Sequence, residues 1–117
     1  MNTLRNRVQL IGHLGQDPKL VTFDSGKKKM NVTMATTEFF KNAKGEKVND
    51  TQWHKIVAWG KPAENFTKYT KKGSEVAMNG KLIHRNYEDK EGNKRYITEV
   101  VVDEFILLDK LDANTPF

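Results

Sequence analysis

One helical segment interrupts a chain that otherwise has the pattern of extended strands, and this order limits the folds open to it. Residues 62–72 have apolar side chains at helical spacing, with a proline suited to the first turn and a glycine suited to the end. The segments on either side alternate apolar and polar residues, as half-buried strands do. We therefore expect three strands, one helix and two further strands.

The expected strands are rich in β-branched and aromatic residues and end at glycine, proline or polar turn residues. They are residues 7–14 (with 19–23 as an extension past a bend), 30–37, 51–59, 75–87 and 94–108. Gly12 predicts a bend or bulge in the first strand. The polar residues 41–50 are expected to form a mobile loop, and residues 88–93 a charged hairpin loop.

This order favours a mainly β fold. A five-stranded antiparallel barrel with one short helix between the third and fourth strands is the oligonucleotide-binding fold. The order alone does not decide, since other α+β domains share it. We expect the domain to span residues 1–109, followed by a short C-terminal tail at 110–117.

The strand 51–59 carries two tryptophans and a lysine on one face. Side chains alternate across a strand, so Trp53, Lys55 and Trp59 point the same way, with the tryptophans about 20 Å apart. A lysine is rarely buried unpaired, which favours an exposed face. Base stacking with the lysine at phosphates would use all three residues. The alternative is that both tryptophans belong to the core and Lys55 extends past them to solvent.

A second strand repeats this combination, because Lys81, Arg85 and Tyr87 share one face of residues 75–87. The formal net charge of +5 also favours a polyanionic partner. The 117 residues contain no apolar run long enough to span a membrane, and residues 1–7 are not expected to form a signal peptide. With no cysteine, the chain has no disulfides, which fits a reducing cytosol.

Catalysis is not expected, and neither a cofactor nor a metal is required. The glycines are scattered, so there is no phosphate-binding loop. The carboxylates of residues 88–91 lie in a hairpin beside lysines, which favours a solvated loop over a nuclease site. His54 lacks metal-ligating partners, because His13 and His84 are remote in sequence, and a structural role is the default.

Several ordered motifs carry a resemblance to a known family. They are residues 6–18 (NRVQLIGHLGQDP), 35–38 (ATTE), 51–61 (TQWHKIVAWGK), 69–74 (YTKKGS), 80–82 (GKL) and 96–100 (YITEV). On these segments the chain resembles the bacterial single-stranded DNA-binding proteins, and the resemblance covers about residues 3 to 108. The resemblance implies an oligonucleotide-binding fold, a homotetramer and a cytoplasmic, nucleoid-associated protein. The implied function is largely sequence-independent binding of single-stranded DNA in replication, recombination and repair.

The resemblance also implies site residues. The base-stacking residues would be Trp53, Trp59, Phe40 and Tyr87. To Lys55, the resemblance adds four phosphate contacts, each of which is otherwise a solvated surface cation: Lys61, Lys72, Arg85 and Arg95. His54 falls at the family's subunit interface. Strict alternation from Met34 places Phe40 on the core side and Phe39 outside, and a bulge would reverse this.

The end of the chain departs from the family, whose members usually close a long flexible tail with several acids and a hydrophobic tip. Pro116 and Phe117 keep the tip, but Asp112 is the only acid after Asp109. We therefore expect reduced recruitment of replication and repair proteins. Two other interpretations remain. The first is an RNA-binding module of the same barrel class, although no residue indicates that the 2′-hydroxyl is read. The second is an interaction module of the replication machinery with little DNA affinity. The aromatic and basic residues argue against the second.

Overall fold

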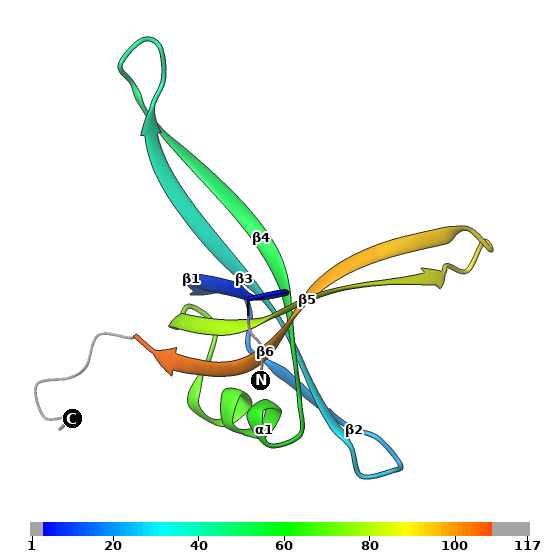
Figure 1. Ribbon diagram of the computed structural model, residues 1–117. Helices are drawn as coiled ribbons and strands as arrows, with labels where there is room; N and C mark the ends of the chain where they lie inside the picture. The colour runs from blue at the N-terminus through cyan, green and yellow to red at the C-terminus, as the bar shows by residue number, and fades with distance from the viewer. Residues whose placement is uncertain (1–3, 109–117) are drawn as a thin grey trace, which may run out of the picture.

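The computed structural model describes residues 4–108 (Figure 1). Its elements are β1 (Val8–Leu14), β2 (Lys19–Thr22), β3 (Lys28–Lys41), β4 (Lys47–Trp59), α1 (Gly60–Tyr69), β5 (Glu75–Glu88) and β6 (Lys94–Leu107). The helix begins and ends slightly earlier than the sequence predicted. Thr70 ends it, with both its backbone N–H and its hydroxyl donating to the carbonyl of Phe66.

Five strands close into the expected barrel. The order of neighbours is β1-β5-β6-β4-β3, and β3 pairs again with β1 at His13 and Leu14. Four of these contacts are antiparallel, whereas β4 and β6 run parallel over a short stretch from Lys55 to Val57. The segment expected to extend the first strand is the separate edge strand β2, which pairs with β3. The mainly β barrel with one helix between its third and fourth strands is confirmed.

The core follows from the two-residue period of the strands. Alternate apolar residues of all five barrel strands point inward, and α1 covers one end of the barrel with Ala63 and Phe66. The Phe66 ring is fully buried and lies 4.8 Å, centroid to centroid, from the ring of Phe105 on β6. This contact fixes the helix against the barrel, beside the end of β4.

Two hairpins extend as long arms beyond the barrel (Figure 1). The β3–β4 arm pairs without interruption from Lys29 with Trp59 to Lys41 with Lys47. The prediction of a mobile loop over residues 41–50 is therefore wrong in its extent, since residues 47–50 belong to β4. Both faces of the arm are exposed near its end, so the apolar alternation that marks a half-buried strand is missing there.

Gly12 allows two strands to approach closely. A β-carbon at this position would lie 2.2 Å from the carbonyl oxygen of Ala35 on β3, so any side chain would force the strands apart. The β1–β5 register runs through Gly12 without a shift. Of the predicted bend or bulge, the bulge is therefore absent, and the glycine serves the closure of the barrel, where β1 begins to pair with β3 at His13.

Residues 1–3 and 109–117 lie outside the described part of the chain. The domain boundary at 109, the tail at 110–117 and the tip residues Pro116 and Phe117 therefore stay predictions. Between residues 4 and 108, no helix combines the length and apolar character needed to cross a membrane.

Candidate nucleic-acid interface

One side of the sheet, which we call the outer face, points away from the core and carries most of the predicted contacts. Residues directly opposite one another on paired strands share a face. Register therefore places together Lys29, Thr33, Ala35, Phe39, Trp53, Lys55, Trp59, Ile83, Arg85, Tyr87, Arg95 and Glu99. The side chains of Trp53 and Trp59 are 62% and 42% exposed and neither belongs to the core. The alternative of two core tryptophans is therefore wrong.

The ring of Trp53 rests on Gly15, the residue after β1. A β-carbon on Gly15 would come within 2.5 Å of the ring atom Cζ3 of Trp53 and 3.0 Å of the Thr33 hydroxyl. The glycine thus leaves the space that the indole occupies. Because the ring is supported on one side and exposed on the other, it offers a flat apolar surface to solvent.

Trp59 lies in a small aromatic and basic cluster at the other end of β4. The ring of Phe23 stacks against it at 6.2 Å between centroids and an interplanar angle of 24°. The Lys29 ammonium lies 5.2 Å from the centroid of the indole, within the range of a cation–π interaction. Phe23 reaches Trp59 because residues 23–27 form a tight hairpin turn between β2 and β3.

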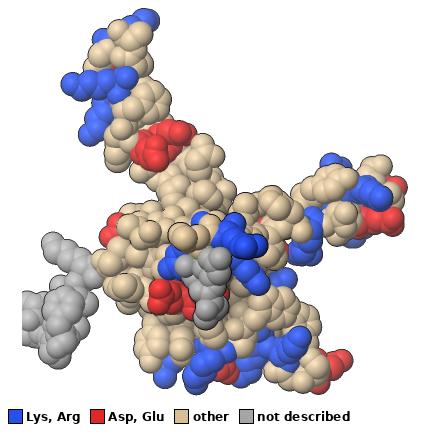
Figure 2. All heavy atoms as spheres, viewed as in Figure 1, with Lys and Arg blue, Asp and Glu red and all other residues tan. Residues whose placement is uncertain are grey.

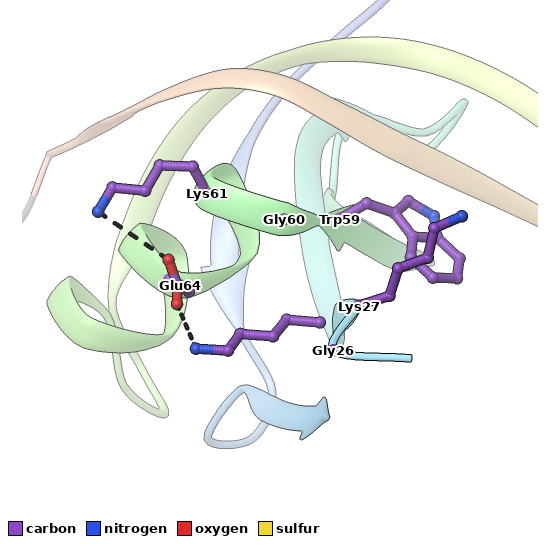
Figure 3. Close-up of a pocket in the computed structure, with 7 residues that line it drawn as sticks. Gly26, Lys27, Trp59, Gly60, Lys61 and Glu64 are labelled. Carbon is purple, nitrogen blue, oxygen red and sulfur yellow. Dashed lines mark hydrogen bonds and ion pairs between the residues drawn. The ribbon is translucent and has the colours of Figure 1, made fainter. Parts of the chain in front are cut away.

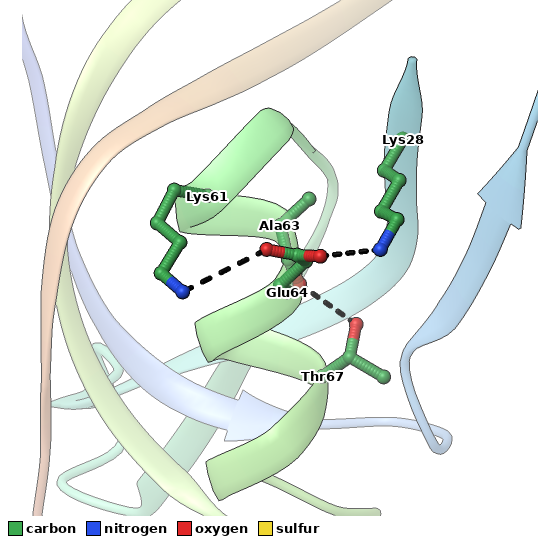
Figure 4. Close-up of polar contacts among 5 residues, drawn as sticks. All are labelled: Lys28, Lys61, Ala63, Glu64 and Thr67. Atoms are coloured by element: carbon green, nitrogen blue, oxygen red, sulfur yellow. Dashed lines mark hydrogen bonds and ion pairs between the residues drawn. The ribbon is translucent and has the colours of Figure 1, made fainter. Parts of the chain in front are cut away.

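A groove of about 450 Å³ opens beside Trp59, between the β2–β3 hairpin and the start of α1 (Figure 3). Its lining residues are Gly26, Lys27, Lys28, Trp59, Gly60, Lys61 and Glu64. Glu64 pairs with Lys28, and more distantly with Lys61, whose Nζ lies 3.9 Å from Oε2 (Figure 4). The hydrogen bond and charge of Lys28 lower the pKa of Glu64. The groove is lined by one carboxylate and three lysines, so it keeps a positive balance.

The β3–β4 arm presents its two phenylalanines on opposite faces. Its register has no bulge, so Phe39 lies opposite Asn49 on the outer face, whereas Phe40 lies opposite Val48 on the other. The Lys47 ammonium lies 4.8 Å from the centroid of the Phe39 ring. Lysine side chains gather at the end of this arm (Figure 2). Phe40, which is 52% exposed, is therefore not on the face that carries Trp53.

The β5–β6 arm carries cations that already have partners. Arg85 forms two hydrogen bonds with Glu99, from Nε to Oε1 at 2.8 Å and from Nη2 to Oε2 at 3.3 Å. Arg95 donates from Nε to Oδ2 of Asp89 at 3.0 Å. Hydrogen bonding to Arg85 lowers the pKa of Glu99, and its carboxylate raises the pKa of Arg85. Tyr87 lies opposite Arg95 with its ring half exposed.

Comparison with known proteins identifies the family. Residues 5–108 match the model of the single-strand binding protein family. The chain belongs to this family. The resemblance seen in the sequence is thereby confirmed, and proteins of this family are binding proteins rather than enzymes.

Individual relatives agree. The chain is 44% identical over 110 residues to single-stranded DNA-binding protein 1 of Chlorobaculum tepidum, covering 93% of this chain and 68% of the relative. It is 42% identical over 110 residues to a protein of the same name from Xylella fastidiosa, covering 93% and 81%. The Plasmodium falciparum SSB in complex with ssDNA superposes with a TM-score of 0.79 at 29% identity, covering 89% of this chain and 95% of that one. A deletion mutant of the Thermus aquaticus single-stranded DNA binding protein shares the fold, with a TM-score of 0.77 at 24% identity over 89% of this chain and 50% of that one.

Besides Phe40 and Lys61, two predicted site residues lie apart from the outer face. Lys72 is in the turn between α1 and β5, where its backbone N–H donates to Asp17. This turn borders the end of β1, because the N–H of Gly73 donates to the carbonyl of Leu14. His54 lies on the opposite face of β4 from Trp53, with Nε2 2.9 Å from the Thr36 hydroxyl. In the described part of the chain, no cluster of three or more His, Asp or Glu residues could hold a metal ion.

Phe23, Gly15 and Glu99 are among the interface residues that were not predicted from the sequence. Phe23 and Gly15 act through contacts with the tryptophans, and Glu99 through Arg85. The turn signal at residues 24–26 indicates that Phe23 lies at a hairpin end, but not that it meets Trp59. Glu99 lies 14 residues from Arg85 on the neighbouring strand, and only the register brings the two together.

Proposed function

We propose that this protein binds single-stranded DNA, largely without sequence specificity, by stacking bases on the aromatic rings of its outer face. The rings assigned to this role are Trp53, Trp59 and Tyr87, with Phe39 on the β3–β4 arm. The proposed phosphate contacts are Lys55 on β4, Lys61 at the start of α1 and the more distant Lys72. By covering single-stranded DNA, the protein would protect and organise it during replication, recombination and repair in the bacterial cytoplasm.

One observation carries this proposal: two exposed indoles share a strand face with a lysine between them, outside the core. Exposed apolar surface rimmed by polar residues is typical of an interaction site. Every base has a π-face, so stacking is tolerant of sequence, and lysines beside the rings attract the phosphates. Relatives named as single-stranded DNA-binding proteins support single-stranded DNA as the ligand.

Tryptophan fluorescence gives the direct test, because the proposed contacts include both tryptophans of the chain. Titration with poly-dT should quench the emission strongly. Stacking is worth about 1–3 kcal/mol per base, so Trp53→Ala should weaken binding about tenfold to a hundredfold. Trp53→Phe keeps a ring and serves as the matched control, with a smaller loss. Unchanged affinity in both Trp53→Ala and Trp59→Ala, with each variant folded by circular dichroism, would sink the assignment.

Competition with a duplex separates stacking from plain charge attraction. A duplex hides the base faces but keeps the phosphates, so unlabelled double-stranded DNA should displace labelled poly-dT poorly at moderate salt. Equal competition by both forms would instead indicate a general basic surface. A labelled poly-rU strand in the same assay compares RNA with DNA directly.

We also propose that the protein acts as a homotetramer, with β1 and His54 at its interfaces. Apart from His13 and Leu14, the second edge of β1 has no strand partner among residues 4–108. An open strand edge is suited to pairing with another copy. Joining several barrels also lengthens the track available to one DNA strand.

A further inference from the structure

A buried acid lies in the middle of the basic outer face. Glu99 on β6 is 4% exposed, and its neighbours across the sheet are Lys55 on β4 and Ile83 on β5. Arg85 donates two hydrogen bonds to it, and the charges of Lys29 and Lys55 also favour its ionised form. A carboxylate at this place opposes the approach of a polyanion, so its presence needs a physical account.

The pairing restricts what Arg85 can do. The side chain of Arg85 is 48% exposed, whereas that of Glu99 is 4% exposed, so the pair is open only on the arginine side. Moving Arg85 to a phosphate would leave a buried carboxylate without its main partner, which is strongly unfavourable. While paired, Arg85 and Glu99 carry no net charge together. A neutral pair releases no counterions when DNA binds.

The exposed side of Arg85 is nevertheless a useful surface. A guanidinium is planar and stacks on aromatic rings, including bases. Nε and Nη2 use one N–H each on Glu99, and a guanidinium has five N–H donors, so donors remain for a base edge. Tyr87 lies two residues further along the same strand face, where its ring is half exposed. Arg85 and Tyr87 thus offer two neighbouring flat surfaces.

We propose that Glu99 is a positioning residue that keeps Arg85 on the outer face when DNA binds, so that Arg85 contacts bases as a planar group and does not act as a phosphate-binding cation. The inference rests on the proposed function of single-stranded DNA binding. It replaces the role expected for Arg85 from the family resemblance. It also assigns to Glu99 a role in holding the binding surface in shape.

The salt dependence of binding distinguishes the two roles of Arg85. For single strands, each phosphate contact adds about 0.7 to the slope of log K against log salt. The variants are Arg85→Gln/Glu99→Gln, which keeps the net charge, and Lys55→Gln as the reference for a lost phosphate contact. Poly-dT titrations between low and moderate salt should show an unchanged slope for the double variant and a slope shallower by about 0.7 for Lys55→Gln. The double variant should bind several-fold more weakly at every salt concentration.

Single substitutions keep the test decisive. Glu99→Gln releases Arg85 as a free cation, so the slope should steepen by up to about 0.7 and binding at low salt should tighten. Arg85→Lys keeps a positive charge beside Glu99 but removes the planar guanidinium. The affinity should therefore fall, while the slope of log K against log salt stays constant. This variant tests the proposal even if the double variant does not fold.

Each contrary result has a clear meaning. A double variant with the shallow slope of Lys55→Gln would show that Arg85 binds phosphate, and an unchanged slope in Glu99→Gln would show that Glu99 does not restrain it. Either result overturns the inference. Failure of the wild-type protein to bind poly-dT, or indifference to loss of both tryptophans, would instead overturn the proposed function.

Discussion

At the scale of single residues, we expect the support beneath a ring to contribute to binding in addition to the ring itself. Gly15 leaves the space in which the Trp53 indole rests. Gly15→Ala should push the ring aside, because the added methyl would meet it at 2.5 Å, while the aromatic side chain itself remains. We expect weaker poly-dT binding, by less than the tenfold to hundredfold loss expected for Trp53→Ala.

Fluorescence titration of Gly15→Ala measures this loss, and the emission spectrum of the free protein should also shift. Gln16→Ala, at the exposed next residue, is the matched control and should bind as the wild type does. If Gly15→Ala binds with wild-type affinity, the position of the Trp53 ring above Gly15 has no part in binding.

The two phenylalanines of the β3–β4 arm offer a second test at this scale. Phe39 shares the outer face with Trp53, and Phe40 lies on the opposite one. Phe39→Ala should therefore weaken binding to long poly-dT by about tenfold, the lower range of a lost stack, whereas Phe40→Ala should change it little. Each variant is the matched control for the other, because both rings are exposed and adjacent in sequence. A larger effect of Phe40→Ala would show that Phe40, the residue that the family resemblance indicates, makes the stacking contact.

The predictions for single residues differ in whether the local sequence is enough to decide them. The exposure of Trp53 and Trp59 could be inferred because Lys55, between them on the same face, is rarely buried. The choice between Phe39 and Phe40 depends on whether the strand contains a bulge, and sequence alone does not settle that. The partner of Arg85 depends on the register between β5 and β6, which is likewise set by the whole sheet.

At the scale of elements, the Arg85–Glu99 ion pair joins β5 to β6 and should make stability depend on pH. The pKa of Glu99 lies below its ordinary value of 4.5. A lowered pKa in the folded state contributes stability that is complete above the ordinary pKa and is lost as the pH falls through the lowered one. The wild type should therefore lose more stability between pH 6 and pH 3 than Glu99→Gln does.

Urea unfolding followed by circular dichroism at several pH values measures this difference. The two proteins differ at one group only, so acid effects elsewhere cancel in the comparison. Parallel stability curves across the whole range would contradict a native-state interaction of the ionised Glu99 carboxylate.

Element existence was easier to predict than element length. The alternation of residues 51–59 and 75–87 and the helical spacing near Phe66 predicted a strand, a later strand and the helix between them. The length of the β3–β4 arm was underestimated, because its end is exposed on both faces and lacks the two-residue alternation of apolar side chains. The separation of β2 from β1 also went unpredicted, since the pairing of this segment with β3 is a tertiary contact that the local residue pattern does not specify.

At the scale of the whole molecule, an apolar row indicates where copies of the barrel meet. Ile11 on β1, Ala77 on β5 and Ile106 on β6 lie directly opposite one another, on the side of these strands that points away from the core. Ile11 and Ile106 are 54% and 66% exposed. Together with the open edge of β1, this row gives a neighbouring copy both apolar surface and backbone groups to bind.

Ile106→Glu tests the row within the proposed homotetramer. Light scattering should find the wild-type protein at four times the mass of the chain at micromolar concentration, and the variant in smaller assemblies. A charge placed at the centre of an apolar interface would be buried without a partner, whereas in a single barrel it would remain in water, so the fold should persist by circular dichroism. Ile106→Val keeps the apolar surface and should retain the wild-type mass. A wild-type monomer would reject the assembly but not the barrel, and a tetrameric Ile106→Glu variant would show that subunits meet elsewhere, with the edge of β1 and His54 the next surfaces to substitute.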